Sequence, residues 1–489
     1  MPVLLLLLVL LYFPLFHHLT WLPIRIWDEA RLAMNAWEAF HNGHWFIPHF
    51  EGKPDMWSTK PPLLPIMQAL LTYVTGPGEL AIRLPAAMAG LGSCLLIAWW
   101  INKRLAMPEA AFMAALVLVT SQGYVHQHAT RTGDYDAVLS FFMLWASLSW
   151  FDAMFFGRTK ALFWFWISLT LGVMTKSIAA LFFSPAYLLF GLVNLKSFLV
   201  GIRSRPFLFG MLVFIFTVAG YYLVRETFNH GYLQAVWDNE LGGRYAGVIE
   251  THHHGLWFFL QRLVHTEYSE WFVLLIPGLI IGSARRDAAL RASGNYVLLL
   301  ILVYLLIISL AATQLEWYDV PLFPVMALPV ALLLYTGWQW LSGSPVLSKR
   351  IKPLALFLAF AFIVFYVPYG RMLGKTFEPQ EYPEERVFYR IGHFLQDARD
   401  GLYSLDGFRL LQVDYSAHND IYLEWMRYEG TDVARTSFEM LEPGDRLIIF
   451  QDHVKEQIDA HWSYEIMDTY YEILLIRLEQ RRVNSSKTP

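Results

Sequence analysis

Long apolar segments recur along this chain of 489 residues and constrain its fold more than any other feature. Stretches of about 20 apolar residues alternate with short charged breaks, and a helix of that length crosses the hydrocarbon core of a bilayer. Hydrophobic residues make up 56% of the sequence and charged residues only 16%. The sequence therefore predicts a polytopic α-helical membrane protein surrounded by membrane lipids.

About eleven segments are expected to span the membrane, and with one or two uncertain segments the total is about 11–13 transmembrane helices. The segments lie at 2–23, 84–102, 109–127, 137–156, 161–178, 179–195, 206–226, 257–282, 295–313, 321–341 and 353–369. One more apolar stretch, 61–75, is short, and we interpret it as a half-embedded or juxtamembrane piece.

Positive charge orients these segments, because Lys and Arg in short loops are retained on the cytoplasmic side. Basic residues cluster in every second loop, at Lys103/Arg104, Arg158/Lys160, Arg203/Arg205, Arg285/Arg286/Arg291 and Lys349/Arg350/Lys352. Those loops are expected in the cytoplasm. The remaining loops, beginning with 24–83, are expected on the outer side together with everything after 370.

The composition changes near residue 371, where charged residues become frequent and apolar runs shrink to strand length. Strands are expected at 408–414, 445–452 and 471–478, with helices at 417–429 and 453–460. The sequence thus predicts a transmembrane domain over 1–370 and a small extracytoplasmic α/β domain over 371–489.

Two features exclude other classes of function. The net charge is −4, so nothing suggests a nucleic-acid partner. The single cysteine, Cys94, lies in an apolar run, so an intrachain disulfide is impossible and redox chemistry is not expected.

The first outward loop is dense in charge. From Asp28 onward, apolar residues recur at helical spacing opposite polar ones, which predicts a helix lying on the membrane surface. Asp28 would be an N-cap in the plainest interpretation. Lys60 precedes two prolines that hold its backbone extended. It is either a snorkelling interfacial anchor or a fixed cation suited to a phosphate.

The other outward loops repeat this pattern. Ionisable and aromatic side chains stand at the outer ends of further segments: Arg131, Asp134, Asp136, Lys176, His252, His253, His254, Glu316, Trp317, Tyr318 and Asp319. Each has an ordinary explanation, such as an aromatic belt or a solvated loop. Because ionisable groups at membrane depth are costly, their gathering on one face predicts a functional site.

Several of these stretches resemble motifs of a known family. "DEARLAMNAWE", "GHWFIPHFEGKPDMWSTKPPLLP", "RTGDYDAVLSFFML", "GVMTKSIAAL", "HHHGLWFFL" and "LEWYDVPLFPVMAL" occur in the family's order. The chain, over about 1–340, resembles the bacterial branch of the GT-C glycosyltransferases that contains the lipid A aminoarabinose transferase and the protein O-mannosyltransferase-like enzymes. The Asp-Glu after the first segment, with Lys-Pro-Pro downstream, is the most specific part of this resemblance.

The resemblance implies a reaction and a location. A sugar would pass, with inversion, from a polyprenyl-phosphate carrier such as undecaprenyl phosphate to an acceptor at the periplasmic face of a bacterial inner membrane. The acceptor would be lipid A, a cell-envelope glycan or lipid, or a protein hydroxyl. Neither the donor sugar nor the acceptor is specified by the motifs.

The chemistry of such a transfer assigns roles to the motif residues. A carboxylate must take the proton from the acceptor hydroxyl, and Asp28 is the expected base, supported by Glu29. Cations should stabilise the phosphate leaving group. Its expected ligands are Lys60, Arg131, Lys176 and Tyr318. Asp136 matches the family pattern best as a further catalytic carboxylate, with Asp134 second.

A metal site is left open. Some relatives carry an acidic residue immediately before the Lys-Pro-Pro lysine, which with a later histidine can hold a metal, but Thr59 occupies that position here. A zinc site built on His253 or His254 therefore lacks one carboxylate, although Asp28 or Glu29 could replace it. No other cofactor is expected.

Two other classes of function compete with the transferase. A secondary transporter of an anionic solute or lipid would also have many spans, but it is expected to show repeated halves and charge near the bilayer midplane. A protein that binds lipid head groups through its C-terminal domain would need only a simple anchor. The absence of a convincing repeat and the charges at outer helix ends favour the transferase.

Overall fold

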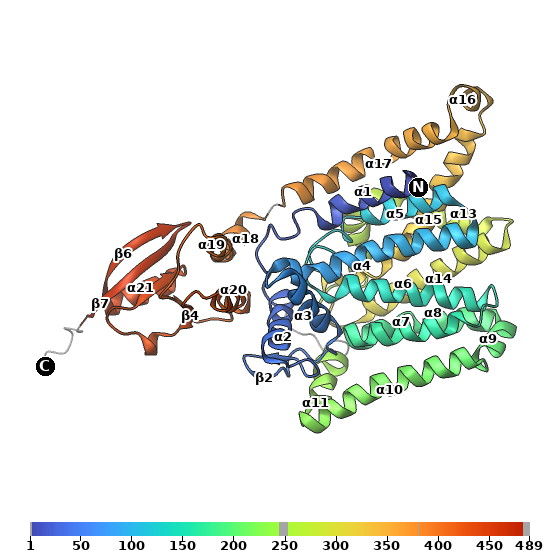
Figure 1. Cartoon of the computed structure of the whole chain (residues 1–489). Coiled ribbons are helices and arrows are strands. Elements are labelled where there is room, and N and C mark those ends of the chain that lie inside the picture. Colours follow the sequence, from blue (N-terminus) through green and yellow to red (C-terminus); the bar gives the residue numbers. More distant parts are fainter. Residues whose placement is uncertain (1, 244–252, 380, 483–489) are drawn as a thin grey trace.

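The computed structural model describes residues 2–243, 253–379 and 381–482. A bundle of apolar helices is joined through a layer of short helices to a C-terminal α/β region (Figure 1). The bundle contains α1 (Pro2–Phe16), α4 (Glu79–Trp100) with η1 (Ile101–Leu105), α5 (Pro108–Val119), α6 (Tyr135–Met154), α7 (Ala161–Lys176) with η2 (Ser177–Leu181), α8 (Ser184–Val193), α9 (Leu195–Ile202), α10 (Arg205–Phe228), α13 (Ser269–Ala284), α14 (Ala288–Leu310), α15 (Leu322–Ser342) and α17 (Pro353–Phe377).

Each segment expected to span the membrane coincides with a helix of this bundle. Among the described residues, 7 helices are long and apolar enough to cross a bilayer, or 8 if α8 and α9, which meet at a bend of 115°, together make one span. The apolar helices α1, α5 and α13 are shorter. The expected polytopic helical architecture is therefore confirmed, and the chain is a multi-pass membrane protein.

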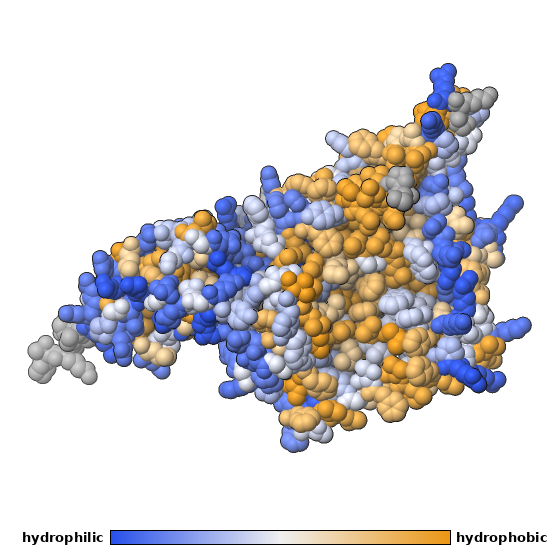
Figure 2. Space-filling view, in the orientation of Figure 1, coloured by the Kyte–Doolittle hydropathy of each residue, from blue (hydrophilic) through white to orange (hydrophobic). Residues whose placement is uncertain are grey.

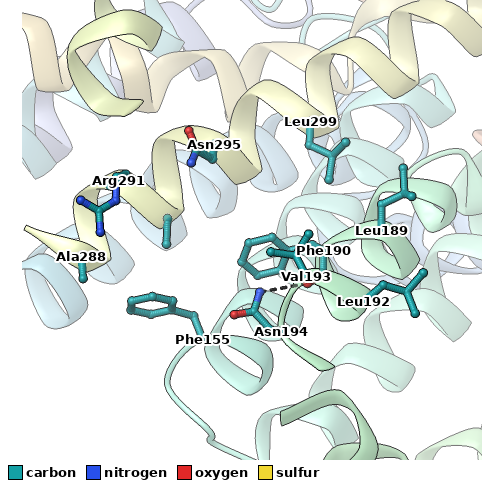
Figure 3. Close-up of a pocket in the computed structure, with 11 residues that line it drawn as sticks. Phe155, Leu189, Phe190, Leu192, Val193, Asn194, Ala288, Arg291, Asn295 and Leu299 are labelled. Atoms are coloured by element: carbon teal, nitrogen blue, oxygen red, sulfur yellow. Dashed lines mark hydrogen bonds between the residues drawn. The ribbon is translucent and has the colours of Figure 1, made fainter. Parts of the chain in front are cut away.

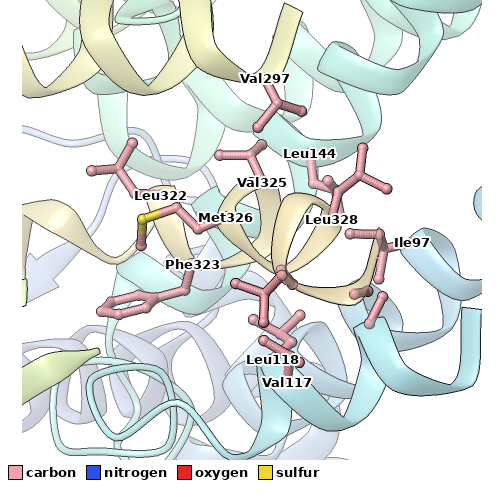
Figure 4. Close-up of a cluster of buried hydrophobic side chains, with 14 of the residues drawn as sticks. Ile97, Val117, Leu118, Leu144, Val297, Leu322, Phe323, Val325, Met326 and Leu328 are labelled. Carbon is pink, nitrogen blue, oxygen red and sulfur yellow. The ribbon is translucent and has the colours of Figure 1, made fainter. Parts of the chain in front are cut away.

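The bundle has a dry core and a lipid-compatible surface. Ile97, Leu118, Leu144, Val297 and Met326, from five helices, meet in its centre and are almost fully buried (Figure 4). On the face seen in Figure 2, apolar side chains predominate over the bundle, and hydrophilic ones gather over the C-terminal region and along the opposite rim. Only 11% of the apolar window in α10 is buried, so this helix presents most of its surface to lipid.

The connecting layer lies between the bundle and the C-terminal region. Its elements are α2 (Asp28–Asn42), β1 (His49–Phe50), β2 (Lys53–Pro54), α3 (Leu63–Thr75), α11 (Tyr232–Val236), η3 (Trp237–Gly242), α12 (Phe258–Arg262), η4 (Leu263–Glu267) and η5 (Glu316–Asp319), while α16 (Pro345–Arg350) lies at the far rim.

Helix α2 forms where its periodicity predicts it, but its apolar face does not lie on lipid. Ala33 and Trp37 are buried in one cluster with Ile421 and Trp425 of the C-terminal region. An amphipathic pattern shows which face of a helix is buried, but it does not show whether that face packs against lipid or against protein. The expectation of a membrane-surface helix was therefore wrong in this respect.

The C-terminal region contains α18 (Pro383–Phe388), α19 (Arg390–Arg399), β3 (Phe408–Leu411), α20 (Ala417–Tyr428), β4 (Val433–Thr436), η6 (Phe438–Met440), β5 (Arg446–Ile449), α21 (Asp452–His461), β6 (Trp462–Tyr470) and β7 (Ile473–Arg481). The five strands form one sheet in the order β4-β3-β5-β7-β6, with β3 parallel to β4 and β5 and the other pairs antiparallel. The three expected strands and two expected helices are all present, and β4 and β6 were missed. Helix α17 continues past the expected boundary at 370.

Candidate active site

Three consecutive residues at the start of α6 bring the expected site together. Asp134 lies 3.2 Å from His128, in the same group of potential ligands as Asp28. The Lys60 ammonium lies over the Tyr135 ring, 5.2 Å from the ring centre. The carboxylate of Asp136 accepts two hydrogen bonds from Lys176 Nζ, at 2.6 and 2.7 Å.

A cavity of about 60 Å³ lies beside these groups. Its polar lining includes Lys60, Asp136, Lys176, Glu240 and Tyr318, and the Lys176 ammonium stands 5.5 Å over the Tyr318 ring. The rest of the lining is largely apolar and comes from membrane helices and η2: Leu139, Ile178, Ala179, Phe182 and Ile308. Both lysines are nearly buried, at 6% and 8% exposure. The cavity thus combines two lysines, each paired with a carboxylate, with an apolar wall.

A larger hollow of about 770 Å³ lies between α6, α8 and α14 at the other end of the bundle (Figure 3). Its walls are mainly Phe155, Leu189, Phe190 and Leu299, and Arg291 supplies the one formal charge among the lining residues. None of the expected site residues lines it. Its size therefore does not make it the candidate active site.

The segment that carries Lys60 is fixed from two sides. The Asp55 carboxylate accepts a bidentate pair of hydrogen bonds from Arg31, both 2.7 Å long, and two more from the backbone amides of Trp57 and Ser58. Burial disfavours the charged form of Asp55, but the hydrogen bonds and charge of Arg31 outweigh burial and lower its pKa. These contacts shape the turn that leads to Lys60.

Helix α10 and the segment after it hold the same turn from the other side. Arg225 donates a 2.6 Å hydrogen bond to the carbonyl of Asp55, and Tyr232 donates one of the same length to the carbonyl of Thr59. Glu240 lies 3.6 Å from Lys60 Nζ and accepts a hydrogen bond from the Thr59 hydroxyl. Glu240 therefore supplies a carboxylate close to the position where the sequence lacks one.

Asp28, His128 and Asp134 form a second polar group beside the cavity. Each offers a potential ligand atom, and these atoms lie within 4.8 Å of one another. Burial disfavours the charged form of His128, but Asp134 and other carboxylates outweigh burial and raise its pKa. Two carboxylates and an imidazole are a donor set that suits a divalent transition-metal ion. Among the residues that the structure describes, these three could hold such a cation.

Two expectations about the first loop need correction. The N-cap of α2 is Trp27, so Asp28 is the first helical residue and not the cap. Glu29 does not face the cavity. It is fully buried and pairs with Arg83 at 2.7 Å, and it accepts hydrogen bonds from the amides of Arg25 and Gly133. Burial disfavours its charged form, but Arg83 outweighs burial and lowers the pKa of Glu29.

Arg131 and the histidines also lie elsewhere. Arg131 donates hydrogen bonds to the carbonyls of His17 and His18 after α1, and it does not line the cavity that holds the two lysines. His253 Nδ1 contacts the carbonyl of Ala312, and the His254 ring stacks on Phe258. Neither histidine joins the group of potential metal ligands. His252 lies outside the described residues.

Sequence reasoning missed His128, Tyr135, Glu240 and the residues that fix the Lys60 turn. His128 precedes the Asp134 motif by six residues, and this proximity was the one available signal. Arg225 lies in α10 and Glu240 in η3, both far along the chain, and no local pattern links them to Lys60.

Comparisons with known proteins agree with this architecture. Residues 59–229 match the family described as dolichyl-phosphate-mannose-protein mannosyltransferase. The chain is 26% identical over 356 residues to the undecaprenyl phosphate-alpha-4-amino-4-deoxy-L-arabinose arabinosyl transferase of Edwardsiella ictaluri, an alignment that covers 70% of this chain and 59% of that protein. The chain thus spans less than two thirds of this relative's length.

Solved structures share the whole fold. The crystal structure of ArnT from Cupriavidus metallidurans bound to undecaprenyl phosphate superposes with a TM-score of 0.71 at 13% identity, covering 100% of this chain and 98% of that one. The apo state of the same protein gives a TM-score of 0.66 at 13% identity, covering 97% and 96%. By family match, sequence relative and fold together, the chain is similar to the GT-C glycosyltransferases, in the branch of the aminoarabinose transferases and the protein O-mannosyltransferase-like enzymes.

Proposed function

We propose that the protein transfers a sugar, with inversion, from a polyprenyl-phosphate carrier to an acceptor hydroxyl at the periplasmic face of a bacterial inner membrane. The acceptor belongs to lipid A, a cell-envelope glycan or lipid, or a protein. The observation that carries the proposal is the cavity in which two buried lysines face an apolar wall. A lipid phosphate would place its charged head group against the lysines and its hydrocarbon chain against the apolar wall.

The lysines bind the leaving group in this mechanism. When the bond from the sugar to the phosphate breaks, negative charge grows on the phosphate oxygens, so fixed cations stabilise the transition state more than the ground state. Lys60 is held by its clamped turn and Lys176 by the Asp136 carboxylate. Tyr318 lines the same cavity and offers a hydroxyl to the phosphate. Arg131 takes no part, because its guanidinium is occupied at the end of α1.

Asp28 is the base that accepts the acceptor proton. It stands at the N-terminal end of α2, next to His128 and Asp134. Asp136 holds Lys176 in place and adds negative charge near the positively charged sugar carbon that develops during transfer. Glu29 contributes only through the fold, since its carboxylate is bound to Arg83.

The test compares purified variants in a transfer assay with an undecaprenyl-phosphate-linked sugar. Asp28→Asn should lose about 10²- to 10⁴-fold in rate, the range for a missing general base. Lys60→Ala should lose transfer while the protein stays folded. The matched control is Lys103→Ala, a lysine of the expected cytoplasmic side, which should retain the wild-type rate. Wild-type rates in Asp28→Asn would refute the assignment of the base.

A further inference from the structure

The C-terminal sheet changes winding direction between β3 and β5. After β3 the chain enters α20, which packs with Leu410 and Ile448 on one face of the sheet. After β5 it enters α21, whose Val454 and Ile458 pack on the opposite face. Because β3 and β5 are adjacent and parallel, the two connections leave a crevice between the carboxyl ends of the strands. Ligands of open α/β sheets bind at such switch points.

A hollow of about 700 Å³ occupies this place. Its lining includes residues that directly follow the two strands, among them Gln412, Tyr415, Phe450 and Gln451. The opposite wall comes from the first outward loop, where the Trp27 ring lies parallel to Tyr415 with centroids 5.0 Å apart. The hollow is therefore shared between the C-terminal region and the residue that precedes Asp28.

Polar atoms in this hollow lack partners. His418 is 3% exposed, and its Nδ1 has no hydrogen-bond partner among the residues that the structure describes. The same holds for Oε1 of Gln451. Burial lowers the pKa of His418 to about 4, so the ring is neutral at physiological pH. Buried polar atoms are nearly always paired, so these two unpaired atoms mark polar groups behind the wall of the hollow whose hydrogen bonds the described residues do not complete.

Two large aromatic side chains of the hollow are also exposed to solvent. Trp27 is 53% exposed and Phe388 is 46% exposed. Trp27 has a backbone φ of 68°, a left-handed conformation that is strained for a bulky residue and is typical of functional sites. The strained backbone turns this ring toward the C-terminal region immediately before the catalytic helix.

The charges of the hollow disfavour an anionic ligand. Asp414, Asp452 and Glu456 line it. The one arginine there, Arg390, is already engaged by Glu472 and by the carbonyl of Phe450. Carboxylates, amides and aromatic faces together suit a neutral, hydroxyl-rich ligand, whose hydroxyls donate to the oxygens and whose ring C–H groups pack on the aromatic faces.

We propose that this hollow binds the saccharide portion of the acceptor and delivers its hydroxyl toward Asp28. The proposal rests on the transferase function above and gives the C-terminal region a role in it. Trp27 is the link, because it is a wall of the hollow and directly precedes Asp28 in the chain.

The test measures binding without turnover, by saturation-transfer NMR on the full chain in a detergent that lacks a sugar head group. The probes are a β-1,6-linked N-acetylglucosamine disaccharide, mannobiose and cellobiose, all of them neutral, with inorganic phosphate as the anionic probe. At least one disaccharide should bind to wild type and equally to Asp28→Asn. Tyr415→Ala should weaken binding about tenfold through loss of an aromatic face.

Two further variants keep the test specific. Tyr415→Phe retains the ring and should bind as wild type does. Met440→Ala removes an exposed side chain outside the hollow and should also bind normally. Circular dichroism and thermal melting check that each variant is folded.

The outcomes separate this proposal from the proposed function. Equal binding by Tyr415→Ala and wild type would overturn it, as would binding of phosphate in preference to every disaccharide, or no disaccharide binding at all. Disaccharide binding that depends on Tyr415 would support it even if wild type showed no sugar transfer, and in that case the transferase proposal alone would fall.

Discussion

The buried pair of Glu29 and Arg83 offers the sharpest test of how the first loop is held. Arg83 donates two hydrogen bonds to Glu29, at 2.7 and 3.0 Å, and others to the carbonyls of Leu19, Leu22 and Pro23. Glu29→Ala would leave a buried guanidinium without its counter-charge and two backbone amides without their acceptor. Removing one partner of a buried ion pair costs about 3–5 kcal/mol.

Amide hydrogen exchange in detergent measures this cost locally. In Glu29→Ala the amides of Arg25 and Gly133 should exchange between about a hundred-fold and a few thousand-fold faster than in wild type, the equivalent of that free energy. The double variant Glu29→Leu with Arg83→Met should recover much of the loss, because it removes both buried charges. Glu51→Gln, which alters an exposed carboxylate of the same loop, is the matched control and should show no change.

One outcome would refute this reasoning. If Glu29→Ala exchanged like wild type but lost sugar transfer, the carboxylate would act in the chemistry and the structural role assigned to it would be wrong. If the variant became labile and transfer fell in proportion to the folded fraction, the structural role would stand.

Three more predictions concern the rest of the molecule. Lys176→Met should destabilise the protein by about 3–5 kcal/mol in thermal melting, since it leaves Asp136 buried and unpaired, and adding Asp136→Asn should restore stability without restoring transfer. Burial raises the pKa of Asp420 from 3.8 to about 6, so the free energy of unfolding falls as pH rises from about 4 to about 6, where the unfolded chain has lost this proton and the folded state still holds it. Asp420→Asn should therefore match wild type near pH 4 and exceed it above pH 7 by up to about 3 kcal/mol in hydrogen exchange of α20. If Asp28 acts as the base, sugar transfer should continue after a chelator has removed divalent cations. If chelation instead abolishes transfer, and Mn²⁺ restores it in wild type but not in His128→Ala, then Asp28, His128 and Asp134 bind a cation.

The bundle could be predicted from sequence because the bilayer imposes a rule that is local. A membrane segment must be apolar and must satisfy its own backbone, so composition alone locates it. The strands β3, β5 and β7 were found for a similar reason, since each is a short apolar run next to turn residues. The edge strands β4 and β6 were missed because edges are half solvated and their sequences, "VART" and "WSYEIMDTY", mix polar with apolar residues and contain no continuous apolar run.

The site could be predicted only in part. Lys60, Lys176, Asp136 and Tyr318 line one cavity, in line with the motif order. Arg131 was misplaced because an arginine at a helix mouth can turn to either side, and here carbonyls after α1 hold it. Pairings that depend on which loops meet in space, such as that of Glu240 with Lys60, leave no trace in local spacing.

The burial of α2 beneath α20 has a consequence for biogenesis. The ribosome makes the first loop early and the C-terminal region last, and at about 5–20 residues per second the interval between Trp37 and Trp425 lasts about 20–80 s. During that time the apolar side of α2 has no protein partner from its own chain. The nascent loop must therefore be shielded by lipid or by a chaperone until synthesis ends. In a chain that stops after α17, the apolar face of α2 would stay exposed and would favour aggregation.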